Sequence, residues 1–153
     1  MLRVYLQRFG LKRRPFPATP DSALYYPATA HEAALAPLVR ALGEDEGLLL
    51  LTGEPGSGKT LLGQVLLERL GGAAVTAFLT NSHFPDRLSL LQAILFDIGL
   101  PYEDGAEQVL RLRLTEHVLK NCAESKRTIV MVDEAHHLSA DLLEELRLLG
   151  NLE

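Results

Sequence analysis

Gly53-Glu54-Pro55-Gly56-Ser57-Gly58-Lys59-Thr60 decides the fold of this 153-residue chain. The stretch matches G-x-x-x-x-G-K-[ST], a loop whose backbone N–H groups surround a polyphosphate. The apolar run Leu48 to Thr52 before it has the length of a buried strand, and residues 61–70 after it have the pattern of a helix. A strand, a glycine loop and a helix N-terminus together form a positive site for phosphate. We expect Lys59 to reach the β- and γ-phosphates and the Thr60 hydroxyl to hold Mg²⁺.

A second part of the predicted site is an acidic pair that follows another buried strand. Thr128 to Val132 is apolar and β-branched, and Asp133-Glu134 come directly after it. Open α/β sheets bind ligands at the carboxyl ends of their strands. We expect Asp133 to hold the Mg²⁺ shell opposite Thr60, and Glu134 to act as general base on an attacking water. The other interpretation of the pair, a cap on the next helix, is disfavoured by the phosphate loop upstream.

Asn81 follows the remaining predicted strand, Ala73 to Thr80. A polar side chain there could hydrogen-bond Glu134 and hold it away from water until a partner binds. Thr80 and Ser82 compete for that role. Asn81 as an ordinary turn residue at a strand end is the alternative.

Strands and helices alternate along the chain, which predicts an α/β fold with a parallel sheet. We expect a three-layer sandwich with three strands and about four to five helices. Pro37 falls inside the first predicted helix and should kink it. The expected helices cover residues 31–42, 61–70, 86–99, 107–123 and 140–149, the last capped by Ser139.

Composition limits the classes of protein to which the chain can belong. Net charge is −5, which argues against a nucleic-acid binder as a whole, although the first fourteen residues are basic and contain no acid. That end is either a solvated terminus or a contact for a phosphate backbone or an acidic lipid surface. Cys122 is the single cysteine and is expected on the apolar face of its helix, so a reducing cytoplasm is the expected compartment. No apolar run has the roughly 20 residues of a membrane span.

A distinctive set of residues precedes the phosphate loop. It consists of Tyr5, Phe9-Gly10-Leu11, Pro15-Phe16, Thr19-Pro20-Asp21 and Tyr25 or Tyr26. With this N-terminal signature the chain resembles the general secretion pathway protein A (ExeA-like) family of AAA+ ATPases, to which transposition-targeting ATPases are related. The segment Val132 to Ser139 is similar to the family's Walker B region, and Leu146 to Glu153 to the helix after it. The phosphate loop is common to many P-loop NTPases, so the N-terminal signature is what narrows the resemblance to this family.

The resemblance implies ATP binding with Mg²⁺ and ATP hydrolysis. Catalysis is assigned to Glu134, Lys59 and Asn81, and the metal to Thr60 and Asp133. Tyr25, Tyr26 and His31 are expected at the adenine, although the two tyrosines could equally pin the N-terminal segment to the core. The expected nucleotide-binding residues are Gly53, Glu54, Pro55, Gly56, Ser57, Gly58, Lys59, Thr60 and Leu61, with Tyr26 over the base.

The resemblance also implies a division of the chain and a set of partners. Residues 1–28 would form an irregular segment rich in proline and aromatic residues, and residues 29–153 the N-terminal part of a truncated AAA+ domain. Family members continue into a further strand, an arginine finger and a lid, so we expect weak binding and negligible hydrolysis from these residues alone. The complete protein would form a homo-oligomeric ring and energise envelope secretion or pilus-type assembly with a secretion-machinery partner, at the inner membrane face. The alternatives are a DNA-associated ATPase of a transposition system and a nucleotide-binding module without catalysis.

Overall fold

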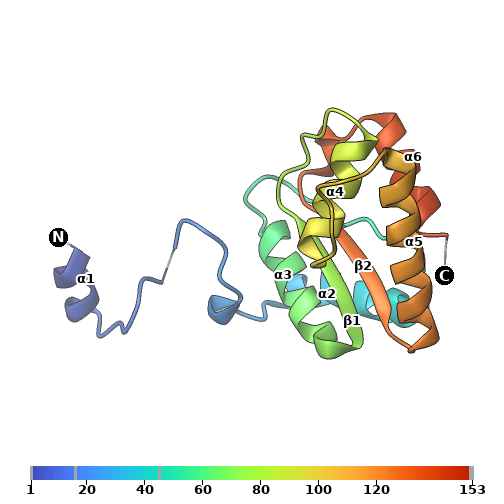
Figure 1. Ribbon diagram of the computed structural model, residues 1–153. Coiled ribbons are helices and arrows are strands. Elements are labelled where there is room, and N and C mark those ends of the chain that lie inside the picture. The colour runs from blue at the N-terminus through green and yellow to red at the C-terminus, as the bar shows by residue number, and fades with distance from the viewer. Residues whose placement is uncertain (1, 16, 45, 152–153) are drawn as a thin grey trace.

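A small parallel sheet organises the molecule (Figure 1). The computed structural model describes residues 2–15, 17–44 and 46–151, with side chains from residue 5 onward. Strands β1 (Ala74–Leu79) and β2 (Arg127–Val132) pair in parallel over six residue pairs. Parallel neighbours need a long crossover, which helices α4 (Arg87–Asp97) and α5 (Glu107–Ala123) supply here. The carboxyl ends of both strands therefore lie at the same edge.

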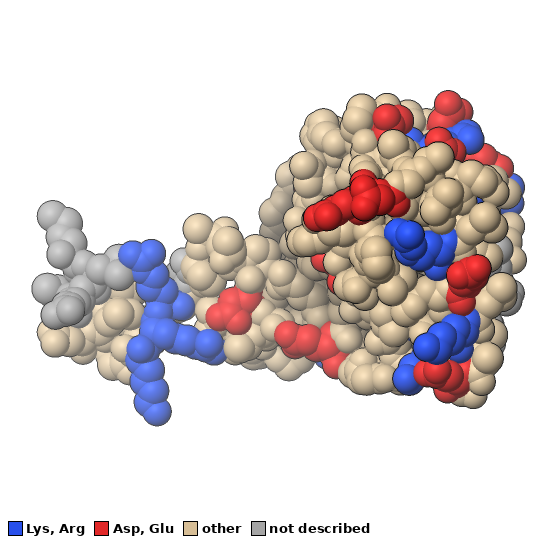
Figure 2. Space-filling view, in the orientation of Figure 1, with Lys and Arg blue, Asp and Glu red and all other residues tan. Residues whose placement is uncertain are grey.

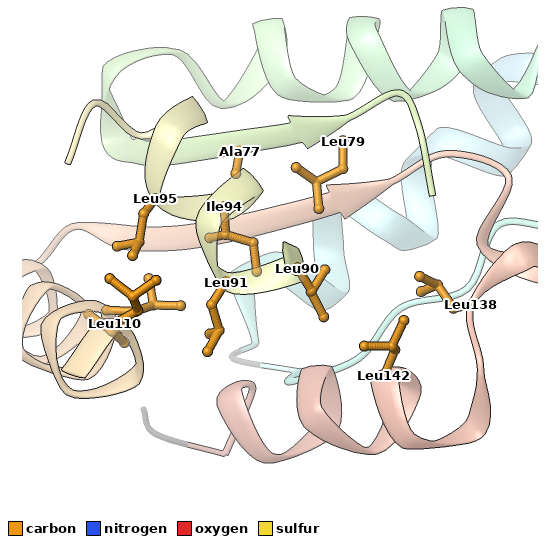
Figure 3. Packing of buried hydrophobic residues seen from close by; sticks show 11 residues of the cluster. Ala77, Leu79, Leu90, Leu91, Ile94, Leu95, Leu110, Leu138 and Leu142 are labelled. Carbon is orange, nitrogen blue, oxygen red and sulfur yellow. The ribbon is translucent and has the colours of Figure 1, made fainter. Parts of the chain in front are cut away.

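Helices cover both faces of the two strands, so the predicted three-layer α/β arrangement is confirmed. Helices α2 (Thr29–Gly43) and α3 (Lys59–Leu70) lie on one face, and α4, α5 and α6 (Ala140–Leu149) on the other (Figure 1). The larger hydrophobic core lies between the strands and the helices α4, α5 and α6. Figure 3 shows the apolar side chains of α4 packed between the strands and the helices α5 and α6. The fully buried members of this core from α4 are Leu90, Leu91, Ile94 and Leu95.

Local signals explain where the helices begin. The Asp86 carboxylate accepts the backbone N–H of Ser89 at 2.8 Å and caps α4. Ser139 caps α6 in the same way, as predicted. Helix α2 runs through Pro37, which lies on its exposed side. The five expected helices are all present, and α5 and α6 have the predicted bounds.

The first expected strand is absent from the part of the chain that the structure describes. Residues 48–52 form no ladder, and the sheet has two strands rather than three. Leu48 and Leu50 are 72% and 77% exposed, whereas Leu49 and Leu51 are partly buried. This alternation is typical of an extended chain with one face against a core. A strand also needs a neighbour for its backbone groups, and the described residues offer this segment none.

The N-terminal segment contains one helix that the sequence did not predict. Leu2–Arg8 forms the seven-residue helix α1, and Ser22–Leu24 forms a single 3-10 turn. The first proline of the chain is Pro15, so nothing prevents helix formation before it. No helix in the described ranges is long and apolar enough to cross a membrane.

The inner face of α5 ends in a polar residue instead of the expected cysteine. Leu110, Leu114 and Val118 are buried as predicted, but the next buried position is Asn121, and Cys122 is exposed. Asn121 donates to the Thr128 hydroxyl at 2.9 Å. That hydrogen bond makes burial of the amide tolerable, and it ties the end of α5 to the start of β2.

The core on α4 gives a test of the fold. Leu91→Ala should lower the free energy of unfolding by about 2–5 kcal/mol, because it leaves a cavity at a fully buried site. Leu112→Ala, on the outer face of α5 where Leu112 is 52% exposed, is the matched control and should cost under about 1 kcal/mol. Urea denaturation followed by circular dichroism measures both. Equal losses in the two variants would contradict the assignment of this core.

Candidate functional site

The predicted phosphate loop connects the extended segment to α3, and its glycines adopt conformations that other residues rarely reach. Gly56 has φ +79°, and Gly58, the N-cap of α3, has φ +88°. A residue with a Cβ is strained at such φ angles, whereas glycine is not. The backbone closes a turn between Ser57 N and Glu54 O at 3.2 Å. The loop therefore has the curled backbone and the free helix N-terminus that suit an anion.

Lys59 lies inside this curl. Its Nζ donates to the carbonyls of Gly53 and Glu54, each at 3.0 Å. An ammonium group has three donors, so one remains for a further acceptor. The lysine is thus held by the loop while keeping capacity for a ligand oxygen.

Thr60 and Asp133, which are 73 residues apart in the sequence, meet at the sheet edge. The Thr60 hydroxyl donates to Asp133 Oδ2 at 2.6 Å. Close packing of α3 on β2 makes the contact possible. Gly63, one turn after Thr60, faces Met131, two residues before Asp133, and a Cβ at position 63 would lie 2.7 Å from Met131 Sδ. A residue larger than glycine would force the Met131 side chain out of this position.

The paired oxygens of Thr60 and Asp133 fit Mg²⁺, a hard cation that takes one or two protein oxygens and completes its shell with phosphate and water. No group of three or more His, Cys, Asp or Glu side chains in the described ranges could hold a metal ion. The site thus lacks the all-protein cage that a structural metal needs. Its donors suit a cation that arrives together with a phosphate ligand.

Glu134 has an unusual backbone and a side chain directed to a histidine. Its φ of +53° is in the left-handed region, and its carboxylate lies 3.2 Å from His136 Nδ1. Its carbonyl accepts from the Ser82 hydroxyl at 2.7 Å. No hydrogen bond among the described residues joins the Glu134 carboxylate to the phosphate loop. Glu134 lies beside the site, one residue from Asp133, but is engaged elsewhere.

Three histidine rings gather next to Glu134. The His137 ring centroid is 4.0 Å from that of His83 and 3.9 Å from that of His136. Desolvation, followed by the neighbouring His136 and His83, lowers the pKa of His137. The cluster thus favours a neutral His137.

Asn81 is not joined to Glu134. Its Oδ1 accepts from the backbone N–H of His83 at 3.1 Å, so it forms the turn that was the alternative for this residue. Ser82, one of the two competing candidates, is 1% exposed and bonds the main chain of Glu134 instead of its carboxylate. Asn81 and Ser82 are adjacent polar residues whose side chains face different sides of the chain. The sequence alone could not tell which of the two contacts Glu134.

The expected adenine residues are in three different situations. His31 Nε2 lies 3.2 Å from the Ser57 carbonyl, which places this ring against the phosphate loop. Tyr25 stacks on His31, with ring centroids 6.1 Å apart and 23° between their planes. Tyr26 is 78% exposed.

Tyr25 also belongs to a network that the sequence did not reveal. Its hydroxyl donates to Glu32 at 2.8 Å, and Arg69 donates to the same carboxylate from two nitrogens, at 2.6 and 3.0 Å. The Arg69 guanidinium lies 5.9 Å from the Tyr25 ring centroid. This network ties the start of α2 to the end of α3, so Tyr25 pins the N-terminal segment to the core. Glu32 and Arg69 are 37 residues apart and fit no motif.

Comparison with known proteins gives two matches. The AAA domain family matches residues 40–153. The chain is also 41% identical over 151 residues to general secretion pathway protein A of Aeromonas hydrophila, covering 98% of this chain and 27% of that protein. The chain thus spans about a quarter of the length of this curated relative. No solved structure matches it significantly. The family resemblance expected from the sequence is confirmed.

The Glu32 network predicts a pH dependence of stability. Hydrogen bonds from Arg69 and then from Tyr25 lower the pKa of Glu32 in the folded protein. A lowered folded pKa gives stability that is present above the unfolded value of about 4.3 and is lost as pH falls through the folded value. Glu32→Gln should therefore unfold at lower urea concentration than wild type at neutral pH, and this difference should shrink below about pH 4.3.

The control for this measurement is Glu116→Gln, since Glu116 is exposed and forms no ion pair in the described ranges. A Glu32→Gln effect that stays constant with pH would show that the network stabilises the fold without its charge.

Proposed function

The chain belongs to the AAA domain family, and from this membership we propose that it binds ATP with Mg²⁺ at the phosphate loop and that the complete protein hydrolyses it. The hydrogen bond between Thr60 and Asp133 carries the proposal. This hydrogen bond joins the hydroxyl at the end of the phosphate loop to the carboxylate after β2. In P-loop enzymes a hydroxyl and a carboxylate at these two places hold the Mg²⁺ of the nucleotide complex. Bound Mg²⁺ would neutralise charge on the phosphates.

The proposed roles follow from the positions of the side chains. Backbone N–H groups of the curled loop receive the phosphates, and Lys59 turns its remaining donor to them. Leu61, in the first turn of α3, supplies one of the free N–H groups of that helix end. Thr60 and Asp133 hold the cation. The loop thereby stabilises charge with groups that are already in place.

Glu134 is proposed as the general base. In the structure its carboxylate contacts His136, so it must turn from this histidine toward the attacking water. Its exposed side chain is free to change rotamer. Asn81 stays a candidate for holding Glu134 in an inactive position, and this role requires opening of its turn with His83.

For the base of the nucleotide we propose Tyr26 as the stacking residue. It is exposed and follows Tyr25, whose ring is already occupied by His31 and Arg69. An exposed ring can stack on adenine without breaking an existing contact. Tyr25 and His31 then support the phosphate loop through the contact of His31 with the Ser57 carbonyl.

The biological role is proposed from the relative. General secretion pathway protein A is named for secretion, and we propose that this chain is an ATPase module of a cytoplasmic protein that energises a comparable envelope process, as a homo-oligomer with a secretion partner. The single cysteine suits a reducing compartment.

Replacing the loop cation tests nucleotide binding. Lys59→Ala should weaken the affinity for a fluorescent ATP analogue by at least about 100-fold, because charge-assisted hydrogen bonds to phosphate are lost. Lys126→Ala, which removes an exposed lysine paired with Glu124, is the matched control and should bind like wild type. Unchanged affinity in Lys59→Ala would remove the loop from the nucleotide site.

The catalytic role of Glu134 is tested by separating binding from turnover. In a chain extended through the further strand, arginine finger and lid that family members carry, Glu134→Gln should bind the analogue normally and slow phosphate release in single-turnover assays by about 100-fold or more, since an amide accepts no proton. Asp133→Asn should instead weaken binding only when Mg²⁺ is present, as judged with and without EDTA. Wild-type turnover at the uncatalysed rate would restrict the proposal to binding, and a normal rate in Glu134→Gln would exclude this residue as the base.

A further inference from the structure

The N-terminal arm, residues 2–14, projects from the rest of the molecule (Figure 1). Its helix α1 has seven residues, whereas isolated helices shorter than about 12–15 residues are marginal in water. Tyr5 and Phe9 pack on each other with centroids 5.0 Å apart, yet remain 44% and 61% exposed. A short helix with an exposed aromatic pair gains stability only when another surface covers it.

The arm is positive and the remainder of the chain is negative. The whole chain has a net charge of −5, and its first fourteen residues carry +5, so the rest carries −10. Arg13 is paired with Asp21 at 3.4 Å and fixes the base of the arm. Arg8, Lys12 and Arg14 form no ion pair in the described ranges. Figure 2 shows basic groups gathered on the projecting end, whereas the visible face of the larger body carries both acidic and basic groups.

The body has a groove whose chemistry complements the arm. It lies at the junction of α4 and α5 and has a volume of about 520 Å³, which accommodates two aromatic rings. Its apolar part includes Phe96, which is 63% exposed and lies edge-on to Tyr102 at 5.2 Å. Glu103 and Asp104 lie in its lining, exposed and without an ion pair among the described residues.

One cation also lines this groove. Arg113 donates to the carbonyl of Pro101, which holds its guanidinium against the loop between the two helices. With two carboxylates and one guanidinium, the groove is negative on balance. It offers an apolar surface beside unpaired acids.

We propose that the arm of one copy of this chain docks in the α4–α5 groove of a second copy. Tyr5, Arg8 and Phe9 follow the i, i+3, i+4 spacing of one helix face. The two rings would pack on Phe96 and Tyr102, and Arg8 and Lys12 would meet Glu103 and Asp104. The groove thus matches the arm in both its apolar and its charged parts.

The groove of a second copy fits the geometry better than the groove of the chain to which the arm belongs. Ser22 bonds Glu68, and the Tyr25 network holds the following residues to α3. From this anchored base the arm leads away from α4 and α5 (Figure 1). A polyanion such as nucleic acid is disfavoured as the occupant, because the −10 body would repel it. The interaction requires no nucleotide and is independent of the proposed ATPase activity.

A charge exchange between the two surfaces tests the proposal. The arm variant is Arg8→Glu with Lys12→Glu, and the groove variant is Glu103→Lys with Asp104→Lys. Sedimentation velocity of the wild-type chain without nucleotide should show concentration-dependent association that weakens with salt. Each variant alone should associate at least about tenfold more weakly, because like charges then face each other. An equimolar mixture of the two variants should associate again, because every arm then finds an opposite groove.

The matched control is Glu116→Lys with Asp141→Lys, which changes net charge as the groove variant does but lies outside the groove. It should associate like wild type, and circular dichroism checks that every variant is folded. The proposal is overturned if wild type is monomeric at about 100 µM, where even weak interfaces associate. It is equally overturned if the groove variant associates normally or if the mixture stays monomeric. A monomeric chain whose arm binds DNA or anionic vesicles would assign the arm to that polyanion instead.

Discussion

Parallel pairing of β1 with β2 is the constraint on which the site depends. In a parallel pair both strands end at the same edge, so the residues after Leu79 and after Val132 leave the sheet side by side. The Asp133 N–H extends the ladder to the Leu79 carbonyl at 2.9 Å. Ser82 can therefore reach the Glu134 main chain. An antiparallel pair would have separated these groups by the length of a strand.

The packing of α3 supplies the second half of this geometry. Gly63 allows the helix to approach Met131 closely, and Thr60, one turn earlier, then reaches Asp133. The phosphate loop is thus held between an extended segment and a helix that is fixed to the sheet. Catalytic and binding groups are most precise when they stand on such rigid elements. The crossover helices contribute indirectly, because their core keeps the two strands in register.

Two parts of the site connect to the rest of the molecule in different ways. His31 and Tyr25 link the phosphate loop to the N-terminal segment, and Glu32 with Arg69 secures that link to α3. Glu134 faces the histidine cluster instead, in a strained backbone conformation. The proposed phosphate and Mg²⁺ ligands already lie together, and the proposed base still has to turn.

The sequence by itself determined the elements with strong local signals. The glycine loop, the helical stripes and the cap at Ser139 depend on neighbouring residues, so the loop and helices α2 to α6 could be placed from pattern alone. Tertiary structure decided what depends on distant partners. Residues 48–52 have the composition of a strand, yet they pair with no other segment in the part of the chain that the structure describes. Whether Asn81 or Ser82 faces Glu134, and whether Asn121 or Cys122 is buried, depended on hydrogen-bond partners from other elements, which no local pattern encodes.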